Sequence, residues 1–483
     1  MEYRIIVLPE GCTLSAAEGT VLLEVLRENG FFVDAPCGGQ GKCGKCTVLV
    51  DGVPVTSCQY AINRDLRVEL PKAESLKILE QGTPCLANAT GTGYAAAFDI
   101  GTTTVVCALL DATGRILAAE SAANPQVAYG ADVISRINGA VRGQGSAMTA
   151  LIRRAMTDLL AACCAAVALE PSKIERISVV GNPAMQQLFL GIPLDNLAAV
   201  PFAPVLMEAD TLPAGEYLPL CPNARLLVVP DLGGFVGADT VGCILASRLH
   251  EAEDTVLLVD IGTNGEMVLR YRGRMVACST AAGPALEGAN IQYGMRAAAG
   301  AIDHVSQEGI HVIGGGEAAG ICGSGLIDAV AVMLEQGILN HRGRVLTEDR
   351  NYALTDRICL TQEDIRQVQL AKGAIAAGIE LMATHLDIRL EDIDRCLLAG
   401  AFGSYLDPDS ACRIGLLPEA LRGKIIAAGN LALEGAKLLA ADEEQLALAQ
   451  ELTDRVEFLE LATLPEFRRC FAQNMFFREE NHG

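Results

Sequence analysis

Short apolar runs separated by turns fill the first 80 residues of the chain. Residues 1–10 and 66–70 have the apolar pattern of strands, and residues 20–28 carry leucine and valine at the spacing of a short helix. The next stretch, QGTPCLANATGTG at 81–93, is rich in Gly, Thr and Ala, which favour flexible chain. We therefore predict a small folded domain over 1–80 and a linker over 81–93.

The pattern then changes to longer apolar strands that end in polar turns. YAAAFDIGTTTVVCALLD at 94–111 predicts a strand, a tight turn and a second strand, and TVLLVDIGTNGEMVL at 255–269 repeats this arrangement. Because the turn joins two strands, it is neither a P-loop nor a Rossmann turn, both of which lead into a helix. Two strands closed by Asp-Ile-Gly-Thr indicate an internal duplication, with two carboxylate-bearing turns facing one cleft.

Helices and strands alternate through the rest of the chain. A helical region near 130–170, a strand near 177–180 and a Gly-rich turn leading into a helix at 228–246 lie between the two copies. The alternation predicts an α/β body, which we divide into a first lobe at 94–200 and a C-terminal domain at 201–483.

Composition and charge narrow the class of protein. The 483 residues are 51% hydrophobic and 20% charged, which is typical of a globular chain of two or three domains. A net charge of −22 argues against a nucleic-acid partner, which needs a basic footprint. The helical apolar stretch 148–170 is interrupted by three charged residues, so we predict no membrane span. The 17 cysteines in so long a chain do not indicate a disulfide scaffold, and the start, MEYRIIVLPEG, lacks the hydrophobic region of a signal peptide, so we predict a reducing cytoplasm.

The stretch CGGQGKCGKCTVLVDGVPVTSC carries the most specific chemistry. Cys37, Cys43 and Cys46 stand close together among glycines, and a fourth cysteine follows. Soft thiolates suit zinc or an iron–sulfur cluster. Structural zinc sites usually pair two C-x2-4-C knuckles, whereas three close cysteines and one distant cysteine are typical of a plant-type [2Fe–2S] site. The spacing therefore favours a [2Fe–2S] cluster.

Hairpin geometry bears on the fourth ligand. Two β-branched runs after Cys46 flank Asp-Gly, the favoured type I′ turn of a two-residue hairpin. In that register Cys46 faces Ser57, so Cys58 returns within one residue of Cys46. Cys85, much further along the chain, is the rival. We predict Cys58 as the fourth ligand.

The two Asp-Ile-Gly-Thr turns offer the groups that bind a nucleotide phosphate. Glycine lets backbone N–H groups approach a phosphate, Thr hydroxyls donate to its oxygens, and the aspartate can hold a hydrated Mg²⁺. The two turns supply Asp99, Gly101, Thr102 and Thr103, and Asp260, Gly262, Thr263 and Asn264.

Further Gly-rich turns are candidates for the rest of a nucleotide site. STAAGPALEGANI contains Gly283, and GICGSGLIDAV places Ser324 near a helix N-terminus, where it would meet an anion or serve as a plain N-cap. RCLLAGAFGSYLD predicts a strand that runs into a turn holding Gly400 and Gly403. Small residues there would let an adenine ring lie against the backbone, although a simple strand-to-helix turn also needs glycine.

These segments together resemble a known family over nearly the whole chain. FDIGTTT, VDIGTNGE and LAGAFGSY are similar to the phosphate-1, phosphate-2 and adenosine motifs of the actin and sugar-kinase superfamily. With a [2Fe–2S] domain in front, and with NPQVAYGADVISRI, GNPAMQQLFLG and PDLGGFVGADTVG, the chain resembles the reductive activators of corrinoid proteins. The resemblance implies a β-grasp ferredoxin-like domain, a linker and a two-lobed, ribonuclease-H-like ATPase.

The resemblance also implies a role for each matched position. Asp99 and Asp260 would organise Mg²⁺. Apart from the matched positions, Asp231, Asp239 and Glu266 are unranked candidates to orient the attacking water, and the alternative is that all three are structural. The cluster ligands would be Cys37, Cys43, Cys46 and Cys58. The phosphates of ATP would bind at Gly101, Thr102, Thr103, Gly262, Thr263 and Asn264, with Gly400 and Gly403 beside the adenosine. From their Gly-rich turns, we add Gly283 and Ser324 as candidate nucleotide-binding residues.

The function implied is the ATP-dependent reduction of Co(II) corrinoid to Co(I) in a methyltransferase or O-demethylase system. Electrons would come from an external low-potential donor, and the chain would form a homodimer that acts on a corrinoid protein. Three other functions fit parts of the pattern: a redox-sensing kinase of a small metabolite, a plain electron carrier, and an activator of another low-potential enzyme such as a 2-hydroxyacyl-CoA dehydratase. The [2Fe–2S] domain argues against the last, because those activators are similar to ATPase dimers bridged by a [4Fe–4S] cluster.

Overall fold

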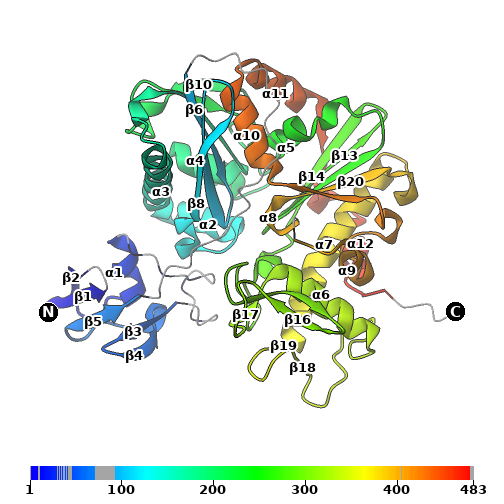
Figure 1. Ribbon diagram of the computed structural model, residues 1–483, viewed down its shortest axis with the longest axis horizontal. Helices are drawn as coiled ribbons and strands as arrows, with labels where there is room; N and C mark the ends of the chain where they lie inside the picture. The colour runs from blue at the N-terminus through cyan, green and yellow to red at the C-terminus, as the bar shows by residue number, and fades with distance from the viewer. Residues whose placement is uncertain are drawn as a thin grey trace.

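The computed structural model describes residues 2–8, 11–29, 31, 33, 35, 39, 41, 46–70, 93–403 and 405–478. Figure 1 shows a small N-terminal domain beside a larger body of two lobes. Each lobe is built on a six-stranded sheet, and the N-terminal domain is built on a five-stranded sheet.

The N-terminal domain consists of β1 (Glu2–Leu8), β2 (Cys12–Ala17), α1 (Leu22–Glu28), β3 (Thr47–Val50), β4 (Val53–Thr56) and β5 (Leu66–Glu69). Its strand order is β2-β1-β5-β3-β4, with β1 and β5 parallel. Helix α1 buries its leucine face in the core of this domain. Asp51 and Gly52 both have positive φ, and Val50 pairs with Val53. The predicted type I′ hairpin and its register are therefore confirmed.

The first lobe contains β6 (Tyr94–Ile100), β7 (Thr104–Leu110), β8 (Ile116–Ala123), β9 (Ile174–Gly181), β10 (Asp210–Pro213) and β11 (Arg225–Val228). Its helices are α2 (Val133–Gly139), α3 (Gly145–Ala166) and α4 (Pro183–Leu190). The strand order is β10-β11-β9-β6-β7-β8. Residues 95–98 of β6 are all apolar because the two faces of the strand enter two different cores, and Asp99 follows them near the end of the strand. Strands β10 and β11 follow residue 200, and our division of the body at that residue stays a prediction.

The second lobe repeats this arrangement. Its sheet contains β12 (Val256–Ile261), β13 (Gly265–Tyr271), β14 (Arg274–Thr280), β20 (Arg395–Ala399), β21 (Ile425–Gly429) and β22 (Val456–Phe458), in the order β21-β20-β12-β13-β14-β22. In both sheets the strand before the Asp-Ile-Gly-Thr turn pairs antiparallel with the next strand and parallel with a later one. The shared topology agrees with the predicted duplication.

Helices α5 (Ala238–Ser247) and α10 (Leu431–Ala441) lie between the two sheets, and α11 (Glu444–Arg455) follows them. Helix α10 belongs to the C-terminal part of the chain but packs on β6 and β9 of the first lobe as well as on α5. Arg176 Nε donates to Ala440 O at 2.8 Å. A Cβ atom at Gly435 would lie 2.2 Å from Gly242 O, so glycine at that position lets the two helices cross closely.

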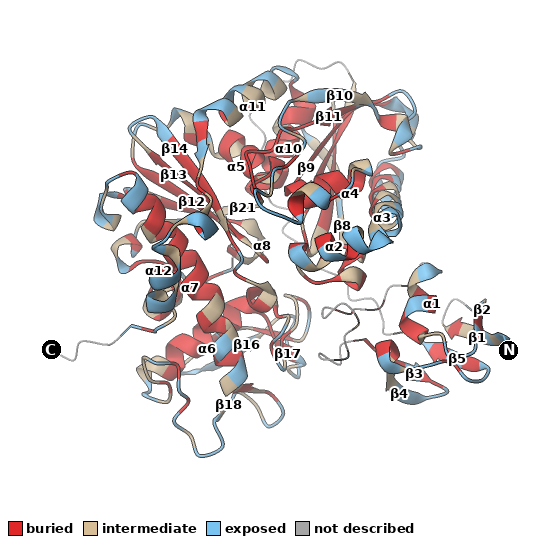
Figure 2. Ribbon diagram, turned by 180° about the vertical axis from the view of Figure 1, so that it is seen from behind, coloured by how far each residue is buried: buried red, intermediate tan, exposed pale blue. Residues whose placement is uncertain are grey.

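The outer part of the second lobe is a mixed layer of helices and short strands. Figure 2 shows buried residues along the sheets and along the inner helices of this layer. Its helices are α6 (Gly323–Glu335), α7 (Gln362–His385), α8 (Gly400–Gly403), α9 (Pro408–Ile414) and α12 (Phe467–Asn474). Its strands are β15 (Ala301–Ser306), β16 (Gly309–Val312), β17 (Gly320–Ile321), β18 (Asn351–Ala353) and β19 (Cys359–Thr361).

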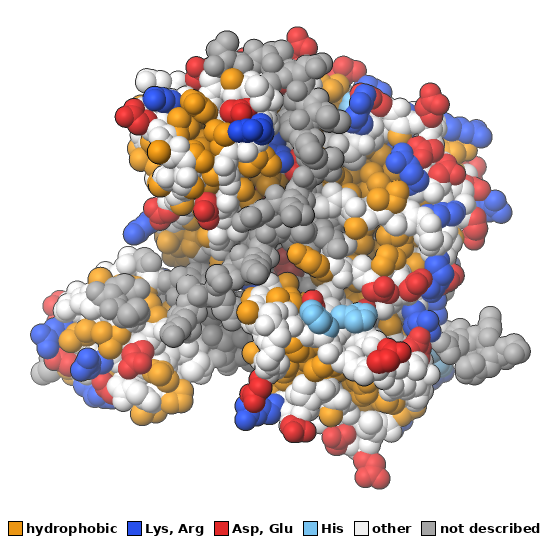
Figure 3. Space-filling view, in the orientation of Figure 1, with side chains coloured by type: hydrophobic (Ala, Val, Ile, Leu, Met, Phe, Trp, Pro, Cys, Tyr) orange, Lys and Arg blue, Asp and Glu red, His pale blue; other side chains and the backbone are white. Residues whose placement is uncertain are grey.

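Charged side chains of both signs are interspersed over the described face shown in Figure 3. The net charge of −22 is therefore not gathered into one patch on that face. Among the described residues, the helices are too short or too polar to cross a lipid bilayer.

Candidate functional site

The two Asp-Ile-Gly-Thr hairpins meet at one cleft between the lobes. Hairpin β6–β7 comes from the first lobe and hairpin β12–β13 from the second. A Cβ atom at Gly101 would lie 2.8 Å from Thr104 O, so the tight first turn requires glycine. Ten of the predicted nucleotide and Mg²⁺ residues line this cleft: Asp99, Gly101, Thr102, Thr103, Asp260, Gly262, Thr263, Asn264, Ser324 and Gly400.

Buried carboxylates give the cleft its charge. Burial raises the pKa of Asp99 to about 6, although a 2.9 Å hydrogen bond from Asn430 Nδ2 opposes the shift. Burial and then the neighbouring Asp99 raise the pKa of Asp260 to about 7. Burial is also the main cause that raises the pKa of Asp239 to about 7. A cation between these groups would favour their ionised forms.

The arrangement suits Mg²⁺ bound together with phosphate. Among the described residues, no three side chains of His, Cys, Asp or Glu converge tightly enough to hold a metal ion alone. Mg²⁺ keeps several waters and is usually bound by one or two carboxylates plus substrate phosphates. Asp99 and Asp260, one from each hairpin, would supply such carboxylates.

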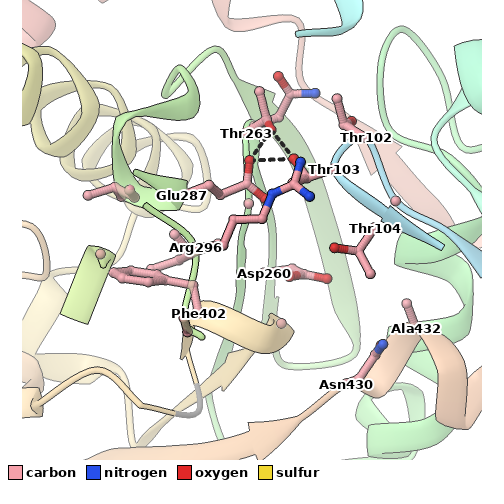
Figure 4. Close-up of a pocket in the computed structure, with 18 of the residues that line it drawn as sticks. Thr102, Thr103, Thr104, Asp260, Thr263, Glu287, Arg296, Phe402, Asn430 and Ala432 are labelled. Carbon is pink, nitrogen blue, oxygen red and sulfur yellow. Dashed lines mark hydrogen bonds between the residues drawn. The ribbon is translucent and has the colours of Figure 1, made fainter. Parts of the chain in front are cut away.

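Glu287 was missed by the sequence analysis, although it bridges the two hairpins. Thr103 Oγ1 donates to Glu287 Oε2 at 2.8 Å, and Thr263 Oγ1 donates to the same oxygen. The two hydroxyl oxygens lie 3.4 Å apart, and Figure 4 shows them and the Glu287 oxygen at the corners of a triangle. An anionic oxygen thus occupies the point on which both threonines converge. Glu287 lies in the same Gly-rich stretch as Gly283, so a glutamate after that turn was the available signal.

Three other side chains of the cleft were also missed. Asn430 is the N-cap of α10, and Asn182 is the N-cap of α4 and donates to Thr102 Oγ1 at 3.2 Å. Arg296 is the basic residue that lines the cleft among those described, and Figure 4 shows it beside Glu287. Asparagine before an apolar run is a helix-start signal. It does not reveal that the two helices begin at one cleft.

The candidates for orienting water differ in their access to the cleft. Asp239 and Glu266 line it, whereas Asp231 is fully buried behind it and accepts a 3.0 Å hydrogen bond from Gln186 Nε2. Burial raises the pKa of Glu266 well above its usual range, and the charges of Asp239 and Asp260 add to the shift. Asp239 and Glu266 are therefore the two that could contact a ligand directly.

The glycines predicted beside the adenosine have different surroundings. Gly400 has φ +87°, and a Cβ atom there would lie 2.5 Å from Asp260 Oδ1. Glycine at this position therefore makes room for the Asp260 carboxylate. A Cβ atom at Gly403 would lie 2.9 Å from the Leu398 side chain, so Gly403 packs against the preceding strand β20, and it does not line the cleft. Phe402 lines the cleft from the same turn.

Gly283 and Ser324 also differ in position. Gly283 has φ +79° at the start of a short turn and does not line the cleft. Ser324 lines the cleft at the first turn of α6, and its Oγ donates to Asp303 O at 2.8 Å. The N-cap of α6 is Cys322, so the alternative of Ser324 as the N-cap is wrong.

The described part of the cysteine site brings two thiols together at the base of the β3–β4 hairpin. Cys46 and Cys58 are both buried, and Ser57 N–H donates to Cys46 O at 3.0 Å. Burial is the main cause that raises the pKa of Cys58, followed by its contact with the Cys46 thiol. Cys37, Cys43 and Cys85 lie outside the described residues. Two adjacent buried thiols fit a thiolate-held [2Fe–2S] cluster, which Cys46 and Cys58 would hold from this side.

Comparison with known proteins places the whole chain in one family. The 2Fe-2S iron-sulfur cluster binding domain matches residues 5–76, the RACo middle region matches 94–252, and the C-terminal domain of RACo, described as the ASKHA domain, matches 254–483. The corrinoid activation enzyme RamQ of Eubacterium limosum is 34% identical over 419 residues, which are 80% of this chain and 70% of RamQ. The chain belongs to the RACo family.

Two further similarities concern an archaeal enzyme and a solved structure. The "[Co(II) methylated amine-specific corrinoid protein] reductase" of Methanosarcina barkeri is 29% identical over 341 residues, 63% of each chain. The solved structure of a "Reductive activator for corrinoid,iron-sulfur protein" superposes with a TM-score of 0.73 and 26% identity over 98% of both chains. The RACo fold, with its iron–sulfur domain and its ASKHA body, is thus the expected multidomain α/β fold.

Proposed function

We propose that this chain reduces the Co(II) of a corrinoid protein to Co(I), one electron at a time, at the expense of ATP hydrolysis in the cleft. The observation that carries the proposal is the presence, in one chain, of a buried cysteine pair in an iron–sulfur domain and of two Asp-Ile-Gly-Thr turns that face one cleft. The names of two relatives, a corrinoid activation enzyme and a corrinoid protein reductase, give the chemical class of the partner.

Energetics explain why such a reduction needs ATP. When bound, a plant-type [2Fe–2S] cluster supplies single electrons at a potential of about −400 mV. The Co(II)/Co(I) couple of a corrinoid protein lies lower, so the transfer is uphill. Moving one charge through 100 mV costs roughly 2.3 kcal/mol. A ligand that shifts a two-state equilibrium almost completely supplies roughly 5 kcal/mol of differential binding free energy. Nucleotide binding of that strength could therefore offset a potential difference of this size.

Residues from both lobes would bind Mg·ATP in the cleft. Asp99 and Asp260 would hold Mg²⁺ from opposite hairpins, and Thr103 and Thr263 would donate to the phosphates from opposite lobes. Because each lobe contributes one half of the site, a bound nucleotide draws the lobes together. Hydrolysis in such a site depends on positioning and on neutralising the phosphate charge.

The proposal includes three further features of the assembly. The chain forms a homodimer, it accepts electrons from an external low-potential donor, and it works in the cytoplasm. The cysteines among the described residues are all free thiols, as is usual for a protein of a reducing compartment. Sedimentation of the purified protein would test the dimer.

An anaerobic assay tests the proposed reaction. The reduced protein is mixed with a Co(II) corrinoid protein, and the cobalt spectrum is followed with and without Mg·ATP. We expect Co(I) to form only with ATP. Asp260→Asn should lose the ATP-dependent reaction and keep the cluster, whereas Asp158→Asn, at a side chain that is 72% exposed, should behave as the wild type. Co(I) formation without ATP, or none at all, would contradict the proposal.

A further inference from the structure

The segment NPQVAYGADVISRI of the first lobe has no role in the reaction described above. It starts at Asn124, forms the short turn η2 (Pro125–Tyr129) and continues into α2. The Asn124 backbone N–H donates to Thr103 O at 2.8 Å, and its side-chain amide donates to Gly101 O at 2.8 Å. The start of the segment is therefore bound to the phosphate-1 turn.

Arg136 makes a second connection from the other end of the segment. Its side chain is fully buried, its Nη2 donates to Thr102 O, and its Nε donates to Gly130 O at 3.0 Å. One rigid guanidinium thus links the phosphate-1 turn to the residue that follows Tyr129. A displacement of the turn by a bound phosphate would be passed to Tyr129.

Tyr129 faces the N-terminal domain. Arg27 Cζ lies 5.5 Å from the centroid of the Tyr129 ring, which is a cation–π distance. Arg27 belongs to α1, and Figures 1 and 2 both show α1 on the side of its domain that faces the first lobe near α2. Arg27 Nη1 also lies 3.8 Å from the place where a Cβ atom of Gly39 would stand in the cysteine loop. The guanidinium thus lies close to both Gly39 and the Tyr129 ring.

Arg27 also has donors that the described residues do not use. Its Nε and Nη2 atoms are buried and have no hydrogen-bond partner in the described part of the chain. Burial lowers the pKa of Arg27, and the groups that oppose the shift are, in order, Tyr129, Cys46, Cys58 and Glu24. An unsatisfied buried cation is costly. A negatively charged cluster held by those two cysteines would lower that cost.

We propose that the contact between Arg27 and Tyr129 is a docking point that couples nucleotide binding in the cleft to the reduction of the cluster. Phosphate at the first turn changes the position of the ring beneath Arg27, and the charge added on reduction strengthens the attraction on Arg27 from the other side. By linkage, the factor by which the nucleotide changes the reduction equilibrium equals the factor by which reduction changes nucleotide affinity. The inference depends on the proposed function only for the presence of a cluster and a nucleotide.

The reconstituted full-length protein tests the coupling without a corrinoid partner. A spectroscopic redox titration gives the midpoint potential of the cluster with and without a saturating non-hydrolysable ATP analogue and Mg²⁺. Calorimetry gives the affinity for that analogue in the oxidised and the reduced protein. We expect the nucleotide analogue to change the reduction equilibrium of the cluster by a factor of about five or more, which shifts the midpoint potential by about 40 mV for a one-electron couple. Reduction of the cluster should change the affinity for the analogue by the same factor. Because cobalt is absent, failure of the proposed reductase activity would leave this result unchanged.

Variants identify the contact that carries the coupling. Arg27→Gln and Tyr129→Leu should each abolish it, whereas Tyr129→Phe keeps an aromatic face and should retain it. Arg27→Gln should also lower the midpoint potential of the nucleotide-free protein, because a positive charge beside the cluster favours the reduced form. The matched control is Tyr217→Leu, which removes a ring 4.9 Å from Arg153 Cζ within the first lobe and should leave the coupling intact.

Three results would overturn the inference. The first is a midpoint potential that does not change when the nucleotide analogue binds to the wild type. The second is coupling of wild-type size in Tyr129→Leu. In that case Tyr129 contributes only to the packing of its own lobe. The third is an equal loss of coupling in Tyr217→Leu, because a general loosening of the first lobe would then explain the effect.

Discussion

At the scale of single residues, the cleft depends on side chains that come from separate parts of the sequence. Thr103 and Thr263 belong to the two hairpins, Glu287 follows the second hairpin, and Asn430 stands at the start of a helix near the C-terminus. The two hairpins were predictable, because glycine, threonine and aspartate in a turn between strands offer a recognisable set of groups. Glu287 and Asn430 reach the same place only through tertiary packing.

The position of Glu287 leads to a prediction about affinity. Its carboxylate accepts hydrogen bonds from the hydroxyls that would bind a phosphate, so it competes with the nucleotide for them. A hydrogen bond to a charged group contributes roughly 1.5 kcal/mol or more, so Glu287→Gln should bind Mg·ATP about tenfold more tightly. Calorimetry on the variant gives the dissociation constant.

The control for this variant is Glu317→Gln, at a side chain that is 92% exposed, which should leave the affinity unchanged. Weaker binding to Glu287→Gln would contradict the competition and would instead assign the carboxylate a direct, favourable contact with the nucleotide or its cation.

The raised pKa values of the cleft predict how stability depends on pH. Asp99, Asp239 and Asp260 have pKa values raised from 3.8 to about 6, 7 and 7. Between pH 3.8 and about pH 7, these carboxyl groups bind more protons in the folded protein than in the unfolded chain. The free energy of unfolding therefore decreases as pH rises through this range. Urea unfolding of the nucleotide-free protein should therefore show lower stability at pH 8 than at pH 6. Asp260→Asn should reduce this difference.

Asp111 provides the control, because hydrogen bonds from Thr113 are the main cause that lowers its pKa. It is ionised throughout this range, so Asp111→Asn should keep the wild-type difference between pH 6 and pH 8. If the free energy of unfolding varied with pH in the same way for Asp260→Asn and the wild type, the cleft carboxylates would not control the pH dependence of stability.

The cysteine pair leads to a spectroscopic prediction. Cys58 returns beside Cys46 on the β3–β4 hairpin, so Cys58→Ala should lose most of the cluster absorbance after anaerobic reconstitution, and Cys85→Ala should retain it. Loss of absorbance in Cys85→Ala, with retention in Cys58→Ala, would reverse the assignment of the fourth ligand.

At the scale of elements, the apolar pattern predicted most strands near the site. The strands around each Asp-Ile-Gly-Thr turn were predictable because both are long and buried, and the β3–β4 register followed from a two-residue turn. The part played by Gly400 was not predictable. A glycine that approaches an adenine and a glycine that approaches a carboxylate look the same in sequence, and only the distance to Asp260 distinguishes them.

Gly400 therefore supports a prediction at this scale. Gly400 has φ +87°, and a Cβ atom there would meet the Asp260 carboxylate. Gly423 has a similar φ of +77°, but nothing lies within 4 Å of its Cβ position. Gly423→Ala should lose about 1 kcal/mol of stability from backbone strain alone. Gly400→Ala should lose more and should also weaken Mg·ATP binding, as measured by urea unfolding and calorimetry. Equal losses, with unchanged nucleotide affinity, would contradict this role.

At the scale of the whole molecule, sequence alone predicted the order of the parts but not their contacts. The iron–sulfur domain, the duplicated cleft and the family were all recognisable from short motifs. Two contacts were not recognisable from the sequence. They are the cation–π contact of Arg27 with Tyr129 and the hydrogen bond that Arg136 donates to Thr102 O in the phosphate-1 turn. An arginine and a tyrosine in different domains have no shared pattern, and their pairing depends on how the two domains come together.

The crossing of helix α10 has a consequence for how the protein is made. This helix comes from residues 431–441 yet covers β6 and β9, which precede it by more than half of the chain. Until α10 has been synthesised, α5 contacts β9 on the inner face of the first sheet, but β6 lacks the cover that α10 provides. The first lobe therefore reaches its final form only after residues 431–441 have been synthesised, and we expect a gene cut between the lobes to leave β6 without the cover of α10.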